Sequence, residues 1–389
     1  MIKTVPTLLL ILSLMGCSSL LENQHENNQL KQSHQVQINQ TLFHKEAVKL
    51  VAEEDILRLS NEQKKEFLAF YQKELLNNVK PHQALDNFMS TRLSNFTFYG
   101  DTLIASESMK LNKGNCMSLA ILTTALARTV NLEVEYREVS SLPIFEKHEQ
   151  AILVSSHLQS VIYDPTFVPE EDFFYFNRPS IVIDYFPATS NWVNRRLLKR
   201  SLIAQYYINI AAQHIVNDDL NSAFANAELA YQYDNSSSKT DNLLAILHRK
   251  KGDLITAEKF YLSAINKKDT NLNVLQNYAI FLNSQQRFDE LKNLNQKMKK
   301  FDDPNPYVWL DQAYLAQNKN DLQGAEIYFK KVITMAPYVH QAYLGLAQVY
   351  YAKGHDNKAM TILKNGIEWA HKENDRELYQ RKLYSLSNI

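Results

Sequence analysis

The sequence predicts two structural classes in one chain: an α+β domain over residues 45–200, followed by an all-α solenoid of repeats over residues 204–373. Small residues recur every 34 positions in the second half. The first half has no such repeat and combines helical apolar spacing with short strand-like runs. Only 8 of the 389 residues are glycine. This composition favours helices over a turn-rich all-β fold.

Three columns of the repeat step by 34 residues through five copies. They are Ala211, Ala245, Ala279, Ala313 and Ala347; Ala223, Ala257, Leu291, Ala325 and Ala359; and the turn positions Asp218, Gly252, Gln286, Asn320 and Gly354. The period and the small residues resemble the tetratricopeptide repeat (TPR), a helix–turn–helix unit. This resemblance implies five repeats over 204–373, a capping helix over 374–389, and a concave face that binds a peptide or protein.

One copy departs from this pattern. In the third repeat, Leu291 and Met298 stand where the other copies tend to have small residues. Larger side chains at these positions predict a local distortion of the helix packing. An alternative to partner binding is that the solenoid only packs against the preceding domain.

The first residues predict export and a lipid anchor. After Lys3, residues 5–15 form an apolar run of signal-peptide length, too short to span a membrane. Gly16-Cys17 closes this run and resembles the bacterial lipobox, which implies removal of residues 1–16 and lipidation of Cys17. No aspartate follows the cysteine, so the resemblance implies the periplasmic face of the outer membrane. Residues 17–44 are polar and are predicted to be a flexible tether.

The charge balance excludes some partners. Lysine and arginine total 42, as do aspartate and glutamate, so there is no basic excess to neutralise a nucleic acid. Histidines of the solenoid, such as His214 and His248, lack the spacing of metal ligands. No metal or other cofactor is predicted.

The α+β half contains one cysteine, Cys116, at the predicted start of an apolar helix over residues 117–129. Backbone N–H groups at a helix start, together with the helix dipole, are expected to stabilise a thiolate. The same N–H groups can stabilise an oxyanion during acyl transfer. Cys116 is therefore the candidate nucleophile.

A thiol nucleophile also needs a base and a residue that orients the base. Strand-like runs over 150–154 and 160–163, joined by a turn over 155–159, would place His148 directly opposite Asp164. The predicted catalytic triad is therefore Cys116, His148 and Asp164. His157 falls at the tip of the predicted turn and is interpreted as a solvent-exposed residue.

The order helix-Cys, strand-His, strand-Asp, together with the run Gly114-Asn115-Cys116-Met117-Ser118, resembles the bacterial transglutaminase-like superfamily and its papain-like core. The resemblance implies that Cys116 is the nucleophile, His148 the base and Asp164 the orienting acid. Met117 departs from animal-type transglutaminases, which have an aromatic residue there.

The preferred function is an envelope-anchored thiol hydrolase that cleaves peptide or isopeptide bonds, while its TPR repeats bind an envelope protein or peptide. One alternative is a non-catalytic TPR scaffold or assembly lipoprotein. Another is a transglutaminase that cross-links proteins, because the same triad would serve an amine acceptor.

Overall fold

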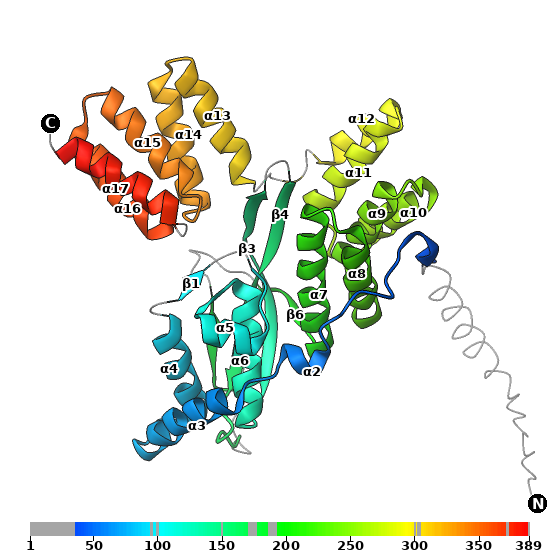
Figure 1. Ribbon diagram of the computed structural model, residues 1–389, viewed down its shortest axis with the longest axis vertical. Helices are drawn as coiled ribbons and strands as arrows, with labels where there is room; N and C mark the ends of the chain where they lie inside the picture. Colours follow the sequence, from blue (N-terminus) through cyan, green and yellow to red (C-terminus); the bar gives the residue numbers. More distant parts are fainter. Residues whose placement is uncertain are drawn as a thin grey trace, which may run out of the picture.

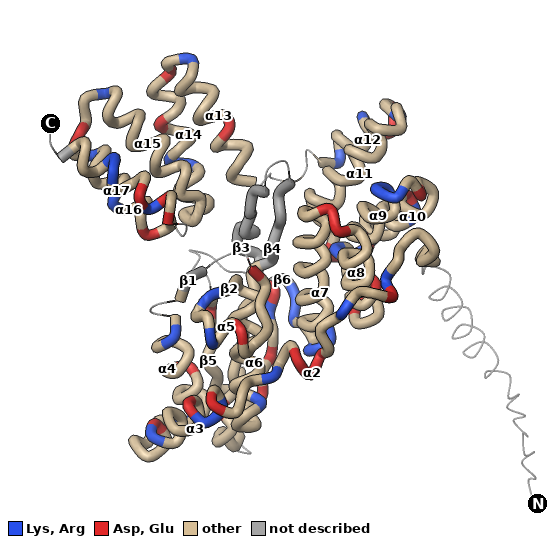
Figure 2. Tube along the Cα trace, in the orientation of Figure 1, with Lys and Arg blue, Asp and Glu red and all other residues tan. Residues whose placement is uncertain are grey.

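The computed structural model describes residues 36–93, 96–98, 101–148, 151–169, 177–185, 193–298, 301, 305–370 and 373–387. An α+β domain precedes a helical solenoid (Figure 1). Basic and acidic residues are interspersed over both parts rather than gathered by sign (Figure 2). In the described residues, no helix is long and apolar enough to cross a membrane.

Short and medium helices begin the α+β domain: η1 (Gln40–Leu42), α2 (Glu53–Ile56), α3 (Asn61–Leu76), α4 (Pro81–Leu93), α5 (Ala105–Leu111) and α6 (Cys116–Thr129). A capping box begins α3, because the Ser60 side chain accepts from the Gln63 backbone N–H and the Gln63 side chain accepts from the Ser60 backbone N–H. Helix α6 is buried from Cys116 to Ala127, since its residues are almost all apolar or small. It forms the centre of the domain core.

The strands are β1 (Thr97–Phe98), β2 (Lys113–Gly114), β3 (Val134–His148), β4 (Ala151–Tyr163), β5 (Ser180–Asp184) and β6 (Val193–Leu197). β1 and β2 form a short parallel pair, and the other four form an antiparallel sheet in the order β5-β4-β3-β6. Helix α6 is tied to this sheet by buried hydrogen bonds, such as Thr124 with the Tyr136 hydroxyl.

The β3–β4 hairpin differs from the predicted one. Residues 155–159 form the interior of β4 rather than a turn, and His148 pairs with Ala151 at the far end of the hairpin. The polar residues of this run are accommodated because His157 and Gln159 both bond to Asp184 on the neighbouring strand. Buried polar groups with partners do not interrupt a strand.

The solenoid contains α7 (Lys199–Val216), α8 (Leu220–Tyr233), α9 (Ser238–Lys250), α10 (Leu254–Asn266), α11 (Leu272–Ser284), α12 (Phe288–Met298), α13 (Pro306–Asn318), α14 (Leu322–Met335), α15 (Gln341–Ala352), α16 (Asp356–Trp369) and α17 (Glu373–Ser387). The predicted turn column is confirmed. All five of its residues have positive φ, between 57° and 84°. Asp219, Asp253 and Asp321, which follow turn residues of this column, cap the next helices, because each accepts a backbone N–H at a helix start.

The hydrophobic core is divided within the solenoid. One core joins the α+β domain to repeats one to three, as far as Leu294 and Met298. A second core runs from Tyr307 to the capping helix, with Tyr379 fully buried in it. The division falls directly after the third repeat, where the sequence predicts distorted packing.

The last part of the predicted flexible tether is instead packed onto the solenoid. Phe43 is buried and stacks on Phe224 with ring centroids 3.8 Å apart, and its edge meets His248. Asn39 donates to Asp253, 2.9 Å away. The prediction of a tether is therefore wrong for residues 36–44, because one aromatic residue in a polar run anchors the segment.

Replacing Phe43 with alanine should lower the free energy of unfolding by about 3–5 kcal/mol, since it removes a buried ring and its stacking on Phe224. Phe288, on α12, is 60% exposed, so Phe288→Ala is a matched control with an expected change within about 0.5 kcal/mol. Urea unfolding followed by circular dichroism measures both. Equal stability of the two variants would contradict the docking of this segment.

Candidate functional site

The loop before α6 is built to place Cys116 at the helix start. Gly114 has φ of +143°, and a Cβ there would lie 2.5 Å from the Ser118 Cβ, so only glycine fits. The Asn115 side chain caps the helix by accepting from the Ser118 N–H. Ser118 in turn fixes the preceding loop, because its hydroxyl accepts from the Leu103 N–H and donates to the Asp101 carbonyl. Each residue of the Gly-Asn-Cys-x-Ser run thus has a structural role.

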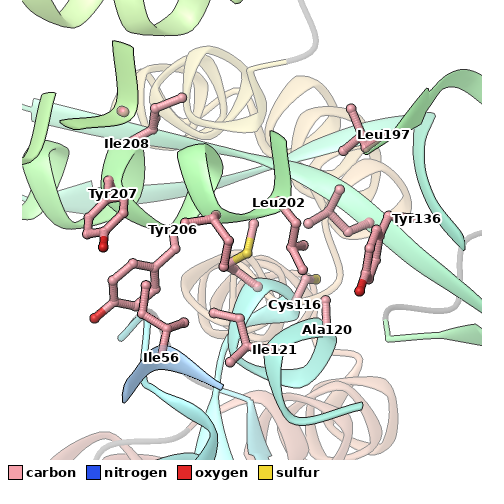
Figure 3. Packing of buried hydrophobic residues seen from close by; sticks show 14 of the residues in the cluster. Ile56, Cys116, Ala120, Ile121, Tyr136, Leu197, Leu202, Tyr206, Tyr207 and Ile208 are labelled. Atoms are coloured by element: carbon pink, nitrogen blue, oxygen red, sulfur yellow. The ribbon is translucent and has the colours of Figure 1, made fainter. Parts of the chain in front are cut away.

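Cys116 is buried between α6 and α7, next to Leu202 (Figure 3). Burial raises the pKa of the Cys116 thiol, and the negative charge of Asp184 raises it further; N–H groups of Cys116 and Leu158 lower it by less. The prediction of a thiolate held by the helix start is therefore wrong for this structure, because desolvation outweighs the helix N–H groups. At neutral pH the thiol is protonated.

A histidine–carboxylate pair lies on the strands beside this cysteine. Nε2 of His157, on β4, is 2.6 Å from Oδ1 of Asp184, on β5. The Gln159 amide donates to the other oxygen of Asp184 at 2.7 Å. His157 is only 1% exposed, so the interpretation of this residue as solvent-exposed is wrong. The two hydrogen bonds fix the carboxylate and, through it, the orientation of the imidazole.

The structure places Cys116 close to the strands that carry His157 and Asp184. The N–H of Leu158, the residue after His157, points at the Cys116 thiol, and the charge of Asp184 acts on the same thiol. In acyl transfer, the thiol would be the nucleophile, the imidazole the base and the carboxylate the group that orients the base. Within the described residues, no cluster of His, Cys, Asp and Glu suits a metal ion.

The predicted pairing of His148 with Asp164 is wrong. His148 lies at the hairpin tip opposite Ala151, whereas Asp164 directly follows the other end of β4. Some 12 residues of extended strand separate these ends, roughly 40 Å at about 3.3 Å per residue. Only Cys116 of the predicted triad therefore remains in the site. Cys17, the predicted lipidation residue, lies outside the described residues.

Asp164 instead fastens the end of β4 to α4. It is buried, accepts from Lys80 Nζ at 2.8 Å, and accepts from both the backbone and the hydroxyl of Thr166. Burial alone would raise the pKa of Asp164, but these hydrogen bonds hold it well below the ordinary 3.8. The role of this carboxylate is structural.

Asp164→Asn should destabilise the protein at pH 7, and the difference from the native chain should shrink as the pH falls. The native state binds a proton at Asp164 less readily than the unfolded chain does. The stabilisation is therefore complete above the unfolded pKa of 3.8 and is lost as the pH falls below it. Melting temperatures measured between pH 7 and pH 3 test this. A pH-independent difference between the two proteins would contradict it.

One sequence signal could have identified β4. Residues 155–159 contain none of Gly, Pro, Asn or Asp, which form most tight turns. The four polar residues around Leu158 in this run resemble a loop by composition alone. The absence of Gly, Pro, Asn and Asp indicates a continuous strand. With a continuous strand, His157 rather than His148 would have been the candidate base.

Comparison with known proteins identifies the repeats. Residues 314–383 match the sequence model of the tetratricopeptide repeat. The C-terminal region of the chain is a helical, TPR-like solenoid. The match lies within the repeats, so the predicted transglutaminase-like fold of residues 45–200 rests on its sequence motifs. No curated protein matches the chain.

Several solved TPR structures resemble the chain weakly. PilF of Pseudomonas aeruginosa is 18% identical, with a TM-score of 0.30, over 49% of this chain and 87% of its own. YrrB, described as a TPR protein with an unusual peptide-binding site, is 18% identical with a TM-score of 0.24, over 46% and 92%. Yeast Tom70 is 16% identical with a TM-score of 0.33, over 47% and 40%. These scores are too low to carry a function over to this chain.

Proposed function

We propose that this protein binds a protein partner through its C-terminal TPR repeats. The observation that carries the proposal is the second hydrophobic core. Among the residues that the structure describes, this core packs repeats four and five and the capping helix without residues of the α+β domain. TPR solenoids bind peptides and proteins on extended concave surfaces. The surface of these repeats is therefore available for a partner.

The first repeats have a different role. Lys239 on α9 contacts Glu138 on β3 at 2.5 Å, and Arg195 on β6 lies 3.9 Å from Asp269, which precedes α11. These contacts fix the sheet against repeat two, and α7 of repeat one packs on β3, β4 and β6. Packing against the preceding domain, the alternative to partner binding, thus accounts for the first repeats and leaves the last two for a partner.

In-cell photo-cross-linking tests this proposal. A photoreactive amino acid at Tyr351, 51% exposed on α15, should give one discrete adduct with another protein. The same residue at Leu76, 84% exposed at the end of α3, is the control and should not give that adduct. No adduct at Tyr351, or the same adducts at both positions, would refute a binding role for the last repeats.

A second candidate function is acyl transfer by Cys116, His157 and Asp184, supported by the 2.6 Å bond between His157 and Asp184. In this reaction His157 takes the thiol proton while the sulfur attacks an amide carbonyl. The C–N bond then breaks, the amine leaves with the proton from His157, and a thioester remains on Cys116. Water as acceptor completes hydrolysis of a peptide or isopeptide bond, and an amine as acceptor completes a cross-link.

An activated ester tests this chemistry without knowledge of the substrate. In a Cys17→Ser protein, Cys116 is the sole cysteine. Incubation with p-nitrophenyl acetate should release p-nitrophenolate and leave an acetyl group on Cys116, detected by mass spectrometry of the peptide. A chain that stays unacetylated while its thiol remains reduced would favour a non-catalytic scaffold.

Anchoring in the cell envelope also belongs to the proposal. It rests on the lipobox-like run that ends at Cys17. An anchor there would hold the protein near envelope proteins and peptides, which would then be its partners or substrates.

A further inference from the structure

The first helix of the fourth repeat, α13, exposes a face that the other repeats bury. Val308 is 42% exposed and Leu315 is 46% exposed. The residues at the same positions of repeats two, three and five are all buried: Thr240, Val274 and Ala342 for Val308, and Leu247, Phe281 and Val349 for Leu315. The repeat therefore predicts that this face of α13 is covered, and in this chain it is not.

In the other repeats, the cover is the second helix of the preceding repeat. Helix α8 packs against α9, α10 against α11, and α14 against α15. In the part of the chain that the structure describes, α12 does not pack in this way on α13. Figure 1 accordingly shows α13–α17 as a body set apart from α11 and α12.

The sequence of α12 explains the missing contact. Helices α10 and α14 use the buried residues Tyr261 and Phe329 at one position of the repeat, and Ala264 and Val332 three residues later. The equivalent residues of α12 are Asn295, which is exposed, and Met298. The Tyr261 ring lies 5.6 Å from that of Phe281, the counterpart of Leu315. An amide in place of this buried ring removes apolar surface that would cover Leu315.

We infer that the Val308–Leu315 face of α13 is a docking surface for an amphipathic helix of a partner protein. The occupant is a helix because a helix fills this position in the other repeats. We expect its apolar face to resemble that of α10, where the buried Tyr261 ring packs against Phe281. This inference rests on the proposed partner-binding function and specifies the partner's chemistry.

A synthetic α10 helix tests this surface in the full-length protein. The probe is a fluorescein-labelled peptide of residues 253–267, and its binding is followed by fluorescence anisotropy. Val308→Asp and Leu315→Asp should each weaken binding by about tenfold or more, as truncation of a central apolar contact does. Both positions are exposed, so the variants should fold, which circular dichroism checks.

Two controls make the result specific. Ile327 on α14 is 58% exposed, and Ile327→Asp should leave binding unchanged. A peptide with Tyr261→Asp should bind about tenfold more weakly. Loss of binding in Ile327→Asp, or no loss in Val308→Asp and Leu315→Asp, would overturn the assignment of this face.

The remaining outcomes also decide the question. A dimer seen by sedimentation and dissolved by Val308→Asp would assign the face to a second copy and overturn the inference. A cross-linked partner at Tyr351 without peptide binding at Val308 would leave the proposed function intact but refute this surface. Peptide binding at the Val308–Leu315 face without a cellular adduct at Tyr351 would support this surface and count against the proposed partner-binding function.

Discussion

His157→Ala is expected to slow acyl transfer to Cys116 by about 10²–10⁴-fold, the usual contribution of a positioned general base. The thiol is protonated at neutral pH, because burial and the charge of Asp184 raise its pKa. In the proposed reaction, attack on a carbonyl therefore requires a base that takes the thiol proton, and His157, 2.6 Å from Asp184, is the candidate for this role. The rate of p-nitrophenolate release in the Cys17→Ser protein measures the effect.

His148→Ala is the matched control, and it should leave the rate unchanged because His148 lies at the other end of the hairpin, opposite Ala151. Asp184→Asn should reduce the rate, since an amide orients the imidazole less well than a carboxylate. If His148→Ala slowed the reaction and His157→Ala did not, the site assigned to the β4–β5 pair would be wrong.

Phe329→Ala is expected to destabilise the last two repeats by about 3–5 kcal/mol while the α+β domain keeps its stability. Phe329 is fully buried in the core of α13–α17, and this core shares no residue with the core around α6. Two cores without shared residues can unfold separately. Amide hydrogen exchange should accelerate over residues 305–370 and stay slow in α6.

Phe224→Ala provides the reciprocal test. Phe224 is equally buried, but its core includes both α8 and α6. Its loss should accelerate exchange in repeats one to three and in the α+β domain, and leave α15 protected. Acceleration across the whole chain by either variant would show that the solenoid unfolds as one unit and would contradict the divided core.

The repeats could be predicted from the sequence because their evidence is local and occurs five times. Small residues at fixed spacing, turn residues with positive φ and aspartate caps each act within one helical hairpin. The start of α6 was equally readable, because Gly114, Asn115 and Ser118 act within five residues of one another. These features needed no knowledge of distant contacts.

The base of the candidate site could not be found in the same way. The run around His157 is turn-like in composition, and it is a strand only because Asp184 accepts from His157 and Gln159 from another strand. Strand pairing of this kind depends on tertiary context more than on propensity. The packing of the segment around Phe43 could not be predicted for the same reason, since its partner Phe224 lies far along the chain.

The account depends most on a division of roles within the solenoid, with the first repeats occupied by the α+β domain and the last repeats open to a partner. Photo-cross-linking at Lys239 and at Tyr351 in cells compares the two directly. At Lys239, which contacts Glu138 on β3, we expect an intramolecular cross-link to that strand. At Tyr351 we expect an adduct with another protein. Intermolecular adducts at Lys239 and none at Tyr351 would contradict the account.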